Sequence, residues 1–288
     1  MPIEYLSPLI IIAAAAIIVA LERKLPYTPG QTLLREGFWN DLILYSIVQS
    51  YVLGFIIGYI IRAIDSSTNL SRLHLISHWP IWGQVILFWI THDFYIYWFH
   101  RLQHRSRHLW RVHEAHHSTK DVDWLSGSRS HSLEILINQT IEFAPIVLLG
   151  AAPEVALIKG MISAIWGMYI HSNIDVHSGR LQYFINGPEM HRWHHSDVVT
   201  DGRYNYATKI ALWDWLFGTA KLPSLTKPQH YGVKEISWPS NYLVQHIFAF
   251  RPFSPSEKGP KKYVDLPHWR FGDIRKLGPD NEQRGFDT

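Results

Sequence analysis

"LILYSIVQSYVLGFIIGYII", residues 42–61, is a run of 20 uncharged residues that ends at Arg62. A helix needs about 20 predominantly apolar residues to cross the hydrocarbon core of a bilayer, and about 17 is the short end of the range. A second run, "YLSPLIIIAAAAIIVAL" at 5–21, has no charge over 17 residues and is followed directly by charged side chains. Both stretches therefore predict helices that span a membrane.

Two further apolar regions extend this pattern. The segment 79–99 starts as "WPIWGQVILFWI" and continues through His92 and Asp93 into "FYIYWF", which predicts a third span. The region 136–170 is interrupted by "GAAPE" at 150–154, and this interruption favours two short helices joined by a turn. Whether that hairpin spans the bilayer or re-enters from one side stays open.

The expected fold class is all-α, a polytopic membrane helical bundle of three spanning helices plus a helical hairpin, with a cytosolic histidine-rich helical cap. Residues 1–90 would form the spanning helices, 91–222 the region with the histidine clusters, and 223–288 a cytosolic tail. Within the tail, "SNYLVQHIFAF" at 240–250 predicts a short helix on the membrane surface. The alternative for the whole chain is the buried helical bundle of a soluble protein.

The distribution of basic residues predicts the orientation. Arginine and lysine are concentrated between the first two spans and directly after the third, whereas the second connection has only Arg62 and Arg72. Because cytoplasmic loops carry an excess of Lys and Arg, the first and third connections should be cytosolic. Every histidine cluster would then face the cytosol, in a multi-pass protein of the bacterial inner membrane or the endoplasmic reticulum.

Composition excludes several kinds of site. The chain has 288 residues, 18 histidines and no cysteine. The absence of cysteine removes disulfides, zinc ribbons, iron–sulfur clusters and thiolate-ligated haem. The net charge of +3 is mild, and the basic residues lie among apolar segments. We therefore expect a membrane protein without a nucleic-acid partner.

Histidines occur in three clusters, "HRLQH" at 100–104, "VHEAHHS" at 112–118 and "MHRWHHS" at 190–196. Residues three and four apart lie on one face of a helix, so each cluster predicts a stripe of imidazoles beside an apolar segment. His171, at the end of the hairpin, and His131 could reach the same point. His92 lies inside the third apolar stretch and belongs to no cluster, so its role stays open.

This number of imidazoles predicts a metal centre with two ions. Imidazole suits zinc, copper, iron and nickel, and one zinc takes three or four protein ligands. Eight to ten nitrogens fit two ions with four or five ligands each, and two adjacent redox ions can activate dioxygen. The candidate ligands are His100, His104, His113, His116, His117, His131, His171, His191, His194 and His195.

Carboxylates are expected to support these ligands. Asp93 lies seven residues before His100 on the same helix face, which places it to accept a hydrogen bond from a ligand N–H. Glu134, three residues after His131, is a candidate of the same kind.

The motifs "DFYIYWFHRLQH" (93–104), "HEAHHS" (113–118), "HRWHHS" (191–196) and "NYATKIALWDWLFGT" (205–219) together resemble the fatty acid hydroxylase superfamily. This superfamily includes sterol desaturases, sterol methyl oxidases, fatty acid 2-hydroxylases and alkylglycerol monooxygenase. The resemblance covers roughly residues 90–220 and is greatest to the sterol-desaturase-like and alkylglycerol-monooxygenase-like branch.

The resemblance implies an integral-membrane, non-haem di-iron enzyme that hydroxylates or desaturates a lipid of the sterol, fatty acyl or alkylglycerol type. It implies O2 as co-substrate, two external electrons and metal ligation by the candidate histidines other than His131. Many relatives have R-x-H-P-x-E around the position of His131, and here Ser132 replaces the proline. No haem-binding or flavin-binding segment is visible, which implies a separate electron donor, cytochrome b5-like or a ferredoxin with its reductase.

Two other classes of protein could use such histidines. A membrane-embedded zinc hydrolase would activate water with one ion and would leave about half of the imidazoles unused. A metal carrier or transporter without catalysis would be expected to place ionisable ligands within its spans, whereas these clusters flank them.

Overall fold

The computed structural model describes residues 2–197, 204–222, 227–228, 230–233 and 236–253. Regular secondary structure in these residues is entirely helical, so the predicted all-α class is confirmed. Most of the predicted tail, residues 254–288, lies outside the described residues. The division of the chain into three regions stays a prediction.

Two helices are long and apolar enough to cross a membrane, as judged over the described residues. The first is α1, Ile3–Lys24, and the second is the continuous helix Asn40–Thr68. This second helix begins as the π-helix η1, Asn40–Gln49, and continues as α2, Ser50–Thr68. Most apolar side chains on both helices are exposed, as expected of surfaces that contact lipid.

The third predicted span corresponds to α3, Ile81–Arg105, which has 25 residues but does not meet the same criterion of apolar composition. The reason is a row of buried polar side chains inside the helix, including Gln84, His92 and Asp93. These residues face protein rather than lipid. Two candidate spans are therefore supported where three were predicted.

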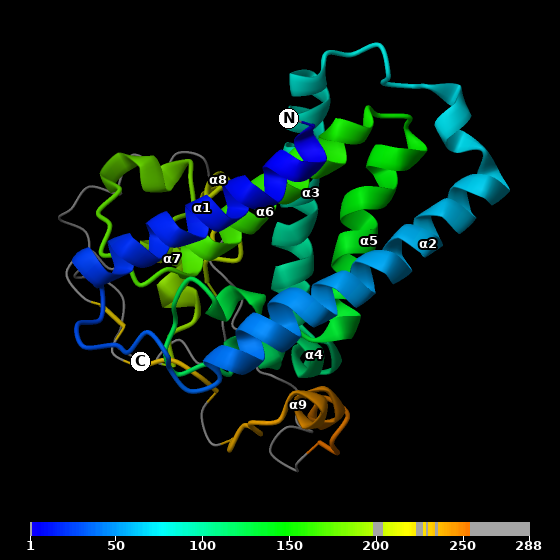
Figure 1. The fold of residues 1–288 in the computed structure, drawn as a ribbon. Helices are drawn as coiled ribbons and strands as arrows, with labels where there is room; N and C mark the ends of the chain where they lie inside the picture. Colours follow the sequence, from blue (N-terminus) through cyan, green and yellow to red (C-terminus); the bar gives the residue numbers. More distant parts are fainter. Residues whose placement is uncertain (1, 198–203, 223–226, 229, 234–235, 254–288) are drawn as a thin grey trace.

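The region 136–170 forms the predicted pair of short helices. They are α5, Ser132–Leu148, and α6, Pro153–His171, and Gly150 in the turn between them has a φ of 70°. Pro153 is the first residue of α6, where its fixed φ suits a helix start. In Figure 1, α1 runs along α6 and α2 runs along α5. Helix α3 contacts both helices of the hairpin, α5 and α6.

The apolar core lies between these long helices. Leu53, Ile57 and Ile61 recur every four residues on one face of α2 and pack against α5. A second cluster, which includes Phe88 of α3 and Ile146 of α5, lies near the turn of the hairpin. The core thus holds α3, α5 and α6 together. The C-terminal ends of α3 and α6 carry histidines of the clusters, His100 and His104 on α3 and His171 on α6.

Short helices complete the fold beyond the ends of α3 and α6. Their bounds are Arg107–His117 for α4, Ser126–Ser128 for η3, Gly179–Tyr183 for η4, Pro188–His194 for α7, Leu212–Leu216 for α8 and Tyr242–Phe248 for α9. The helix between α2 and α3 is η2, Leu70–Leu73. Ser106 separates α3 from α4 and caps α4 by accepting from the Leu109 N–H at 3.4 Å. The histidine-rich part of the chain therefore gathers at one end of the apolar helices.

The helix predicted at 240–250 is present as α9. Leu243 and Ile247 on its outer face are exposed, and Gln245 is buried against Tyr45 of η1, whose hydroxyl donates to it at 2.6 Å. The helix therefore packs on the start of the second candidate span. Its position on a membrane surface stays a prediction.

Gly150 provides a test of the hairpin turn. A Cβ at this position would lie 2.8 Å from the Ser71 carbonyl oxygen, and φ is in the left-handed region. We expect Gly150→Ala to reduce the free energy of unfolding by at least about 1–2 kcal/mol, the cost of the left-handed conformation alone. Thermal unfolding in detergent measures it. Gly54→Ala in α2 is the matched control, because a Cβ there meets nothing within 4 Å and should not destabilise the helix. An unchanged melting temperature for Gly150→Ala would contradict this account of the turn.

Candidate metal centre

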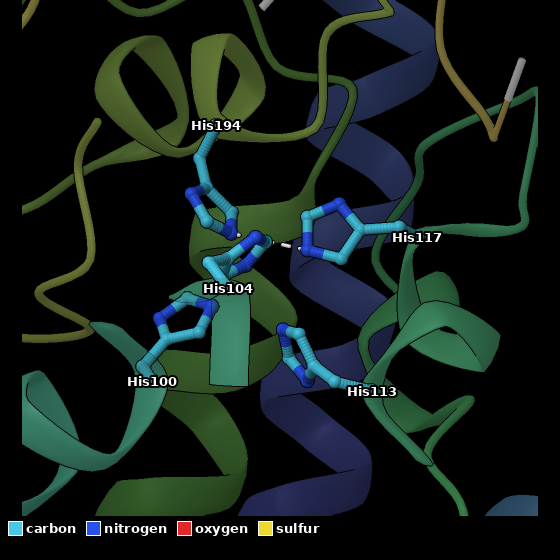
Figure 2. A group of neighbouring side chains, drawn as sticks. All are labelled: His100, His104, His113, His117 and His194. Atoms are coloured by element: carbon cyan, nitrogen blue, oxygen red, sulfur yellow. Dashed lines mark hydrogen bonds between the residues drawn. The ribbon is translucent and has the colours of Figure 1, made fainter. Parts of the chain in front are cut away.

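Nine of the ten candidate histidines converge in two buried groups. Within each group, one ligand atom from every residue lies within 4.8 Å of the others, close enough for each group to hold a metal ion. The five-histidine group is His100, His104, His113, His117 and His194. The four-histidine group is His116, His171, His191 and His195. Figure 2 shows the rings of the five-histidine group pointing toward a common centre.

Each H-x-x-H-H block serves both groups. In α4, His113 and His117 belong to the five-histidine group and His116 to the four-histidine group. The block that starts in α7 is divided in the opposite sense, because His191 and His195 share the four-histidine group and His194 joins the other. Residues four apart therefore belong to one group, and the residue between them turns to the neighbouring group. The spacing of each block predicted a single helix face, and it does not indicate this division between two groups.

Backbone carbonyls orient the rings. The Nδ1 atoms of His100 and His194 lie 2.8 Å from the carbonyl oxygens of Tyr206 and Tyr204. His171 makes the same contact with the Gly167 carbonyl at 2.7 Å. A carbonyl oxygen only accepts hydrogen bonds, so each of these Nδ1 atoms carries the proton and each Nε2 presents a lone pair. This is the usual arrangement behind a metal-ligating histidine.

Glu134 does the same for His113. Its Oε1 lies 2.8 Å from the ring Nδ1, and both side chains are buried. The predicted role of Glu134 as an acceptor behind a ligand therefore matches its position. The residue it supports is His113, 21 positions earlier in the chain.

The inward nitrogens are placed as the ligands of one ion would be. His116 donates through Nδ1 to the Arg129 carbonyl at 3.3 Å, so its Nε2 and that of His171 are both lone pairs, yet they lie 3.2 Å apart. Two lone pairs cannot hydrogen-bond to each other. Neighbouring nitrogens that each bind one ion at about 2.1 Å are separated by roughly 3 Å. Nε2 of His100 and Nε2 of His113 are buried and have no hydrogen-bond partner among the described residues. A metal ion satisfies both observations.

Burial keeps these rings neutral. It lowers the pKa of His194 to about 3 and that of His191 and His195 well below the usual value, with neighbouring imidazoles adding to the effect at His191 and His195. A neutral imidazole is the form that binds metal. The site is therefore in its ligating form at neutral pH.

His131 lies apart from both groups. Its Nδ1 accepts from the Leu133 N–H at 3.1 Å and caps α5, and its Nε2 lies 3.2 Å from the His246 carbonyl oxygen. Both ring nitrogens are thus used by the protein, and the ring lies against that of His246, with their centres 4.7 Å apart. The structure does not support the predicted role of His131 as a metal ligand, and we leave it out of the ligand set.

Asp93 also differs from its prediction. Its carboxylate accepts from the backbone N–H groups of Lys209 and Ile210 at 3.1 and 2.9 Å, and from the Trp213 indole at 3.1 Å. None of its described hydrogen bonds comes from a histidine, because the segment 208–213 takes both oxygens. Asp93 therefore fixes the segment that follows Tyr206, whose carbonyl orients His100, and acts on the site indirectly.

A buried ion-pair network supports the four-histidine group and was not foreseen. Asp41 of η1 accepts from the Arg129 guanidinium at 2.8 and 3.0 Å and pairs with Arg35 at 2.8 Å. Arg35 also makes a two-pronged contact with Asp123. The Arg129 carbonyl holds His116, so the network sets the position of a ligand. No local motif marks these residues, because the partners are 88 positions apart in the chain.

A cavity of about 210 Å³ adjoins the two groups on the side of the long helices. It is bordered by ligands of both groups and by residues of α3, α5 and α6. Six histidines lie on its wall, namely His92 and five members of the two groups, His100, His113, His116, His171 and His191. A molecule in this cavity would lie next to both metal positions.

The comparisons with known proteins agree with this geometry. The family model for fatty acid hydroxylases matches residues 85–219. An ornithine lipid hydroxylase of Rhizobium tropici is 30% identical over 234 residues, which cover 77% of this chain and 69% of the relative. The chain belongs to the fatty acid hydroxylase superfamily. The region matched by the family model contains every residue of the two histidine groups.

Other relatives match over a smaller part of their length. Human alkylglycerol monooxygenase is 30% identical over 206 residues, 63% of this chain and 46% of that protein. A very-long-chain aldehyde decarbonylase of Oryza sativa is 30% identical over 156 residues, 50% of this chain and 54% of that protein. The chain thus spans about half the length of these two relatives. No solved structure matches the chain.

Gly127 tests the position of His171. A Cβ on Gly127 would lie 2.5 Å from the Nδ1 of His171, whose ring is held on its other side by the four-histidine group. We expect Gly127→Ala to displace the ring and to lower the metal content of this group, while the five-histidine group keeps its ion. Elemental analysis of the purified protein measures the change. Gly160→Ala, where the nearest contact is Phe143 at 3.6 Å, is the control. Full metal content in Gly127→Ala would refute the placement of His171.

The buried rings also predict a pH dependence of stability for the metal-free protein. Seven of the nine rings have pKa values below the usual 6.5 in the folded state. Below pH 6.5 the unfolded chain binds protons that the folded rings do not, so stability falls as pH falls. Each such ring contributes up to about 1.4 kcal/mol per pH unit. Thermal unfolding of the chelated protein between pH 7.5 and 5 should show a steadily falling melting temperature, and a flat profile would contradict burial of neutral rings.

Proposed function

We propose that this protein is an integral-membrane di-iron oxygenase that hydroxylates a lipid, using O2 and two electrons from a separate donor. The observation that carries the proposal is the division of nine buried imidazoles into one group of five and one of four. Structural or hydrolytic zinc sites take three or four protein ligands in total. Two ions with nitrogen ligands, held side by side, fit redox chemistry with O2 better than activation of water.

The relatives favour hydroxylation over desaturation. Two of those described above are named as a lipid hydroxylase and a monooxygenase. The overall reaction would be R–H + O2 + 2 electrons + 2 protons giving R–OH + H2O. The two iron ions, when bound, would supply the binding of O2 and its reduction at the C–H bond of the lipid. The substrate would be a sterol, a fatty acyl lipid or an alkylglycerol-type lipid.

The chain would contribute the orientation of the metal ligands and the exclusion of water from the site. Tyr206, Tyr204 and Glu134 fix the orientation of ligand rings from behind, which holds the centre in place before substrate arrives. All nine rings are buried, the most exposed being His116 at 8%. The adjoining cavity would place the target C–H bond beside both ions. Water would thereby be kept from competing with the lipid.

The membrane supplies the substrate in this proposal. α1 and the helix Asn40–Thr68 are apolar enough to span a bilayer, and their exposed faces would contact lipid. The basic residues that follow α3 would keep the metal centre on the cytosolic side. A cytochrome b5-like protein or a ferredoxin with its reductase could then deliver electrons from the cytosol.

Metal analysis of single-residue variants tests the proposal. We expect two iron ions per purified chain and O2 consumption that yields a hydroxylated lipid when reductant is added. His194→Ala, in the five-histidine group, and His195→Ala, in the four-histidine group, should each lower iron content and abolish turnover while the protein still inserts into membranes. His131→Ala is the matched control and should retain both ions. Retention of two iron ions in the variants of His194 and His195 would contradict the proposed metal centre.

The same measurements separate the rival functions. Zinc in place of iron, with hydrolysis of a lipid and no O2 consumption, would indicate a membrane zinc hydrolase. Bound metal without any chemistry would indicate a carrier. The proposal fails in either case.

A further inference from the structure

Arg192 of α7 is a buried cation that makes no ion pair with any described carboxylate. Its side chain is 0% exposed, and its Cζ lies 4.5 and 4.9 Å from the ring centres of Tyr27 and Tyr231. Its hydrogen bonds go to two backbone carbonyls and two hydroxyls, those of Val122, Ser172, Tyr231 and Thr28. These neutral partners hold the guanidinium in place but leave it without a direct counter-ion, which is a costly arrangement inside a protein.

The charge of Arg192 lies beside the four-histidine group. Arg192 directly follows His191 in the chain, and its Nη1 donates at 3.1 Å to the carbonyl of Ser172, the residue after His171. Both histidines are members of the four-histidine group. A positive charge held next to two ligands opposes any increase of positive charge at the position that those ligands surround.

The other buried charges on this side do not pair with Arg192. Four of them balance one another in the ion-pair network described above, Arg35, Arg129, Asp41 and Asp123. The Glu22 carboxylate accepts from the backbone N–H groups of Trp124 and Asn173 at 2.8 and 2.7 Å. Glu22 can therefore weaken the field of Arg192, but it does not neutralise it through a direct contact.

The five-histidine group has the opposite charge behind one of its rings. Glu134 accepts from Nδ1 of His113 at 2.8 Å, and both side chains are buried. A carboxylate in this position makes the ring a stronger electron donor to a metal ion. In the four-histidine group, the described acceptors behind His116 and His171 are backbone carbonyls. A negative charge therefore supports one group, and a positive charge lies beside the other.

We propose that Arg192 and Glu134 give the two metal positions different reduction potentials. Arg192 favours the ferrous state, which carries less charge, in the four-histidine group, and Glu134 favours the ferric state in the five-histidine group. A unit charge about 10 Å away, at an effective dielectric constant of about 20, changes an equilibrium constant more than tenfold. This inference rests on the proposed function and adds the order in which the centre takes up electrons.

The order follows from the two potentials. The first electron from the donor reduces the ferric ion of the four-histidine group to the ferrous state. The second electron reduces the ion of the five-histidine group, and each transfer leaves the donor oxidised by one electron. The position supported by Glu134 is then the last to be reduced and the first to give an electron back.

Potentiometric titration of the iron-loaded protein, without O2 or lipid, tests the inference. Electron paramagnetic resonance and Mössbauer spectra follow the diferric, half-reduced and diferrous forms and give two midpoint potentials. Glu134→Gln keeps an acceptor for His113 but removes the charge. We expect it to raise the lower potential by at least about 59 mV, a tenfold change in the ratio of ferric to ferrous ion, and to change the higher potential less.

Variants of Arg192 separate its charge from its hydrogen bonds. Arg192→Gln removes the charge and should lower the higher potential by at least about 59 mV, again a tenfold change. Arg192→Lys keeps the charge and should retain that potential, although both variants lose hydrogen bonds and should melt at a lower temperature. Arg180→Gln is the matched control, because it removes the same charge at an exposed position, where water and salt screen it.

Three results would overturn the inference. A shift of the higher potential and not the lower one in Glu134→Gln would reverse the order. Unchanged potentials in Glu134→Gln and Arg192→Gln would show that neither charge acts on the ions. Equal shifts in Arg192→Lys and Arg192→Gln would assign Arg192 to packing alone.

Two further outcomes remain decisive. If Arg192→Gln does not hold two ions, Glu134→Gln still determines which potential belongs to the five-histidine group. Zinc in the unaltered protein would refute the proposed function alone, since the potentials of the protein reconstituted with iron would still decide whether the two positions differ as inferred.

Discussion

Imidazoles that turn their lone pairs toward two small volumes, as those of His100, His116, His171 and His194 do, repel one another unless a cation lies between them. A ring could relieve this repulsion by turning an N–H group inward. The carbonyls of Tyr206, Tyr204 and Gly167 prevent this, because each fixes its histidine with the proton on the outer nitrogen. Protonation of one ring would also relieve the repulsion, but burial lowers the pKa of rings such as His194 and His195 and disfavours it. The packing of α3, α4, α6 and α7 therefore keeps nitrogen lone pairs close to one another. A bound metal ion would relieve their repulsion.

The sequence predicted much of this arrangement because the strongest signals are local. Apolar runs of helical length and pairs of histidines four apart depend on residues within one or two turns, and both patterns appear in the structure. The turn at Gly150 is of the same kind, since glycine and proline mark it directly. Fold class, hairpin and the stretches that meet at the centre could therefore be predicted without coordinates.

Features that depend on distant partners were missed or misassigned. Asp93 occupies the expected helix face, but its oxygens are taken by a segment more than 100 residues later, which spacing within α3 does not indicate. His131 resembles a ligand in its local sequence, yet it caps α5 and contacts His246. The pairing of Asp41 with Arg129 across 88 positions left no pattern at all. Polar residues in α3 likewise reduce its apolar character, because they face other helices.

The division of each H-x-x-H-H block between the two groups has a consequence for assembly. α4 and the turn after α7 are shared structural supports, so an ion in one group immobilises backbone that also carries ligands of the other. The second ion then meets rings whose conformational freedom has already been restricted. Ions bound at the two positions would therefore be coupled through the backbone, and the loss of one would weaken the binding of the other without abolishing it.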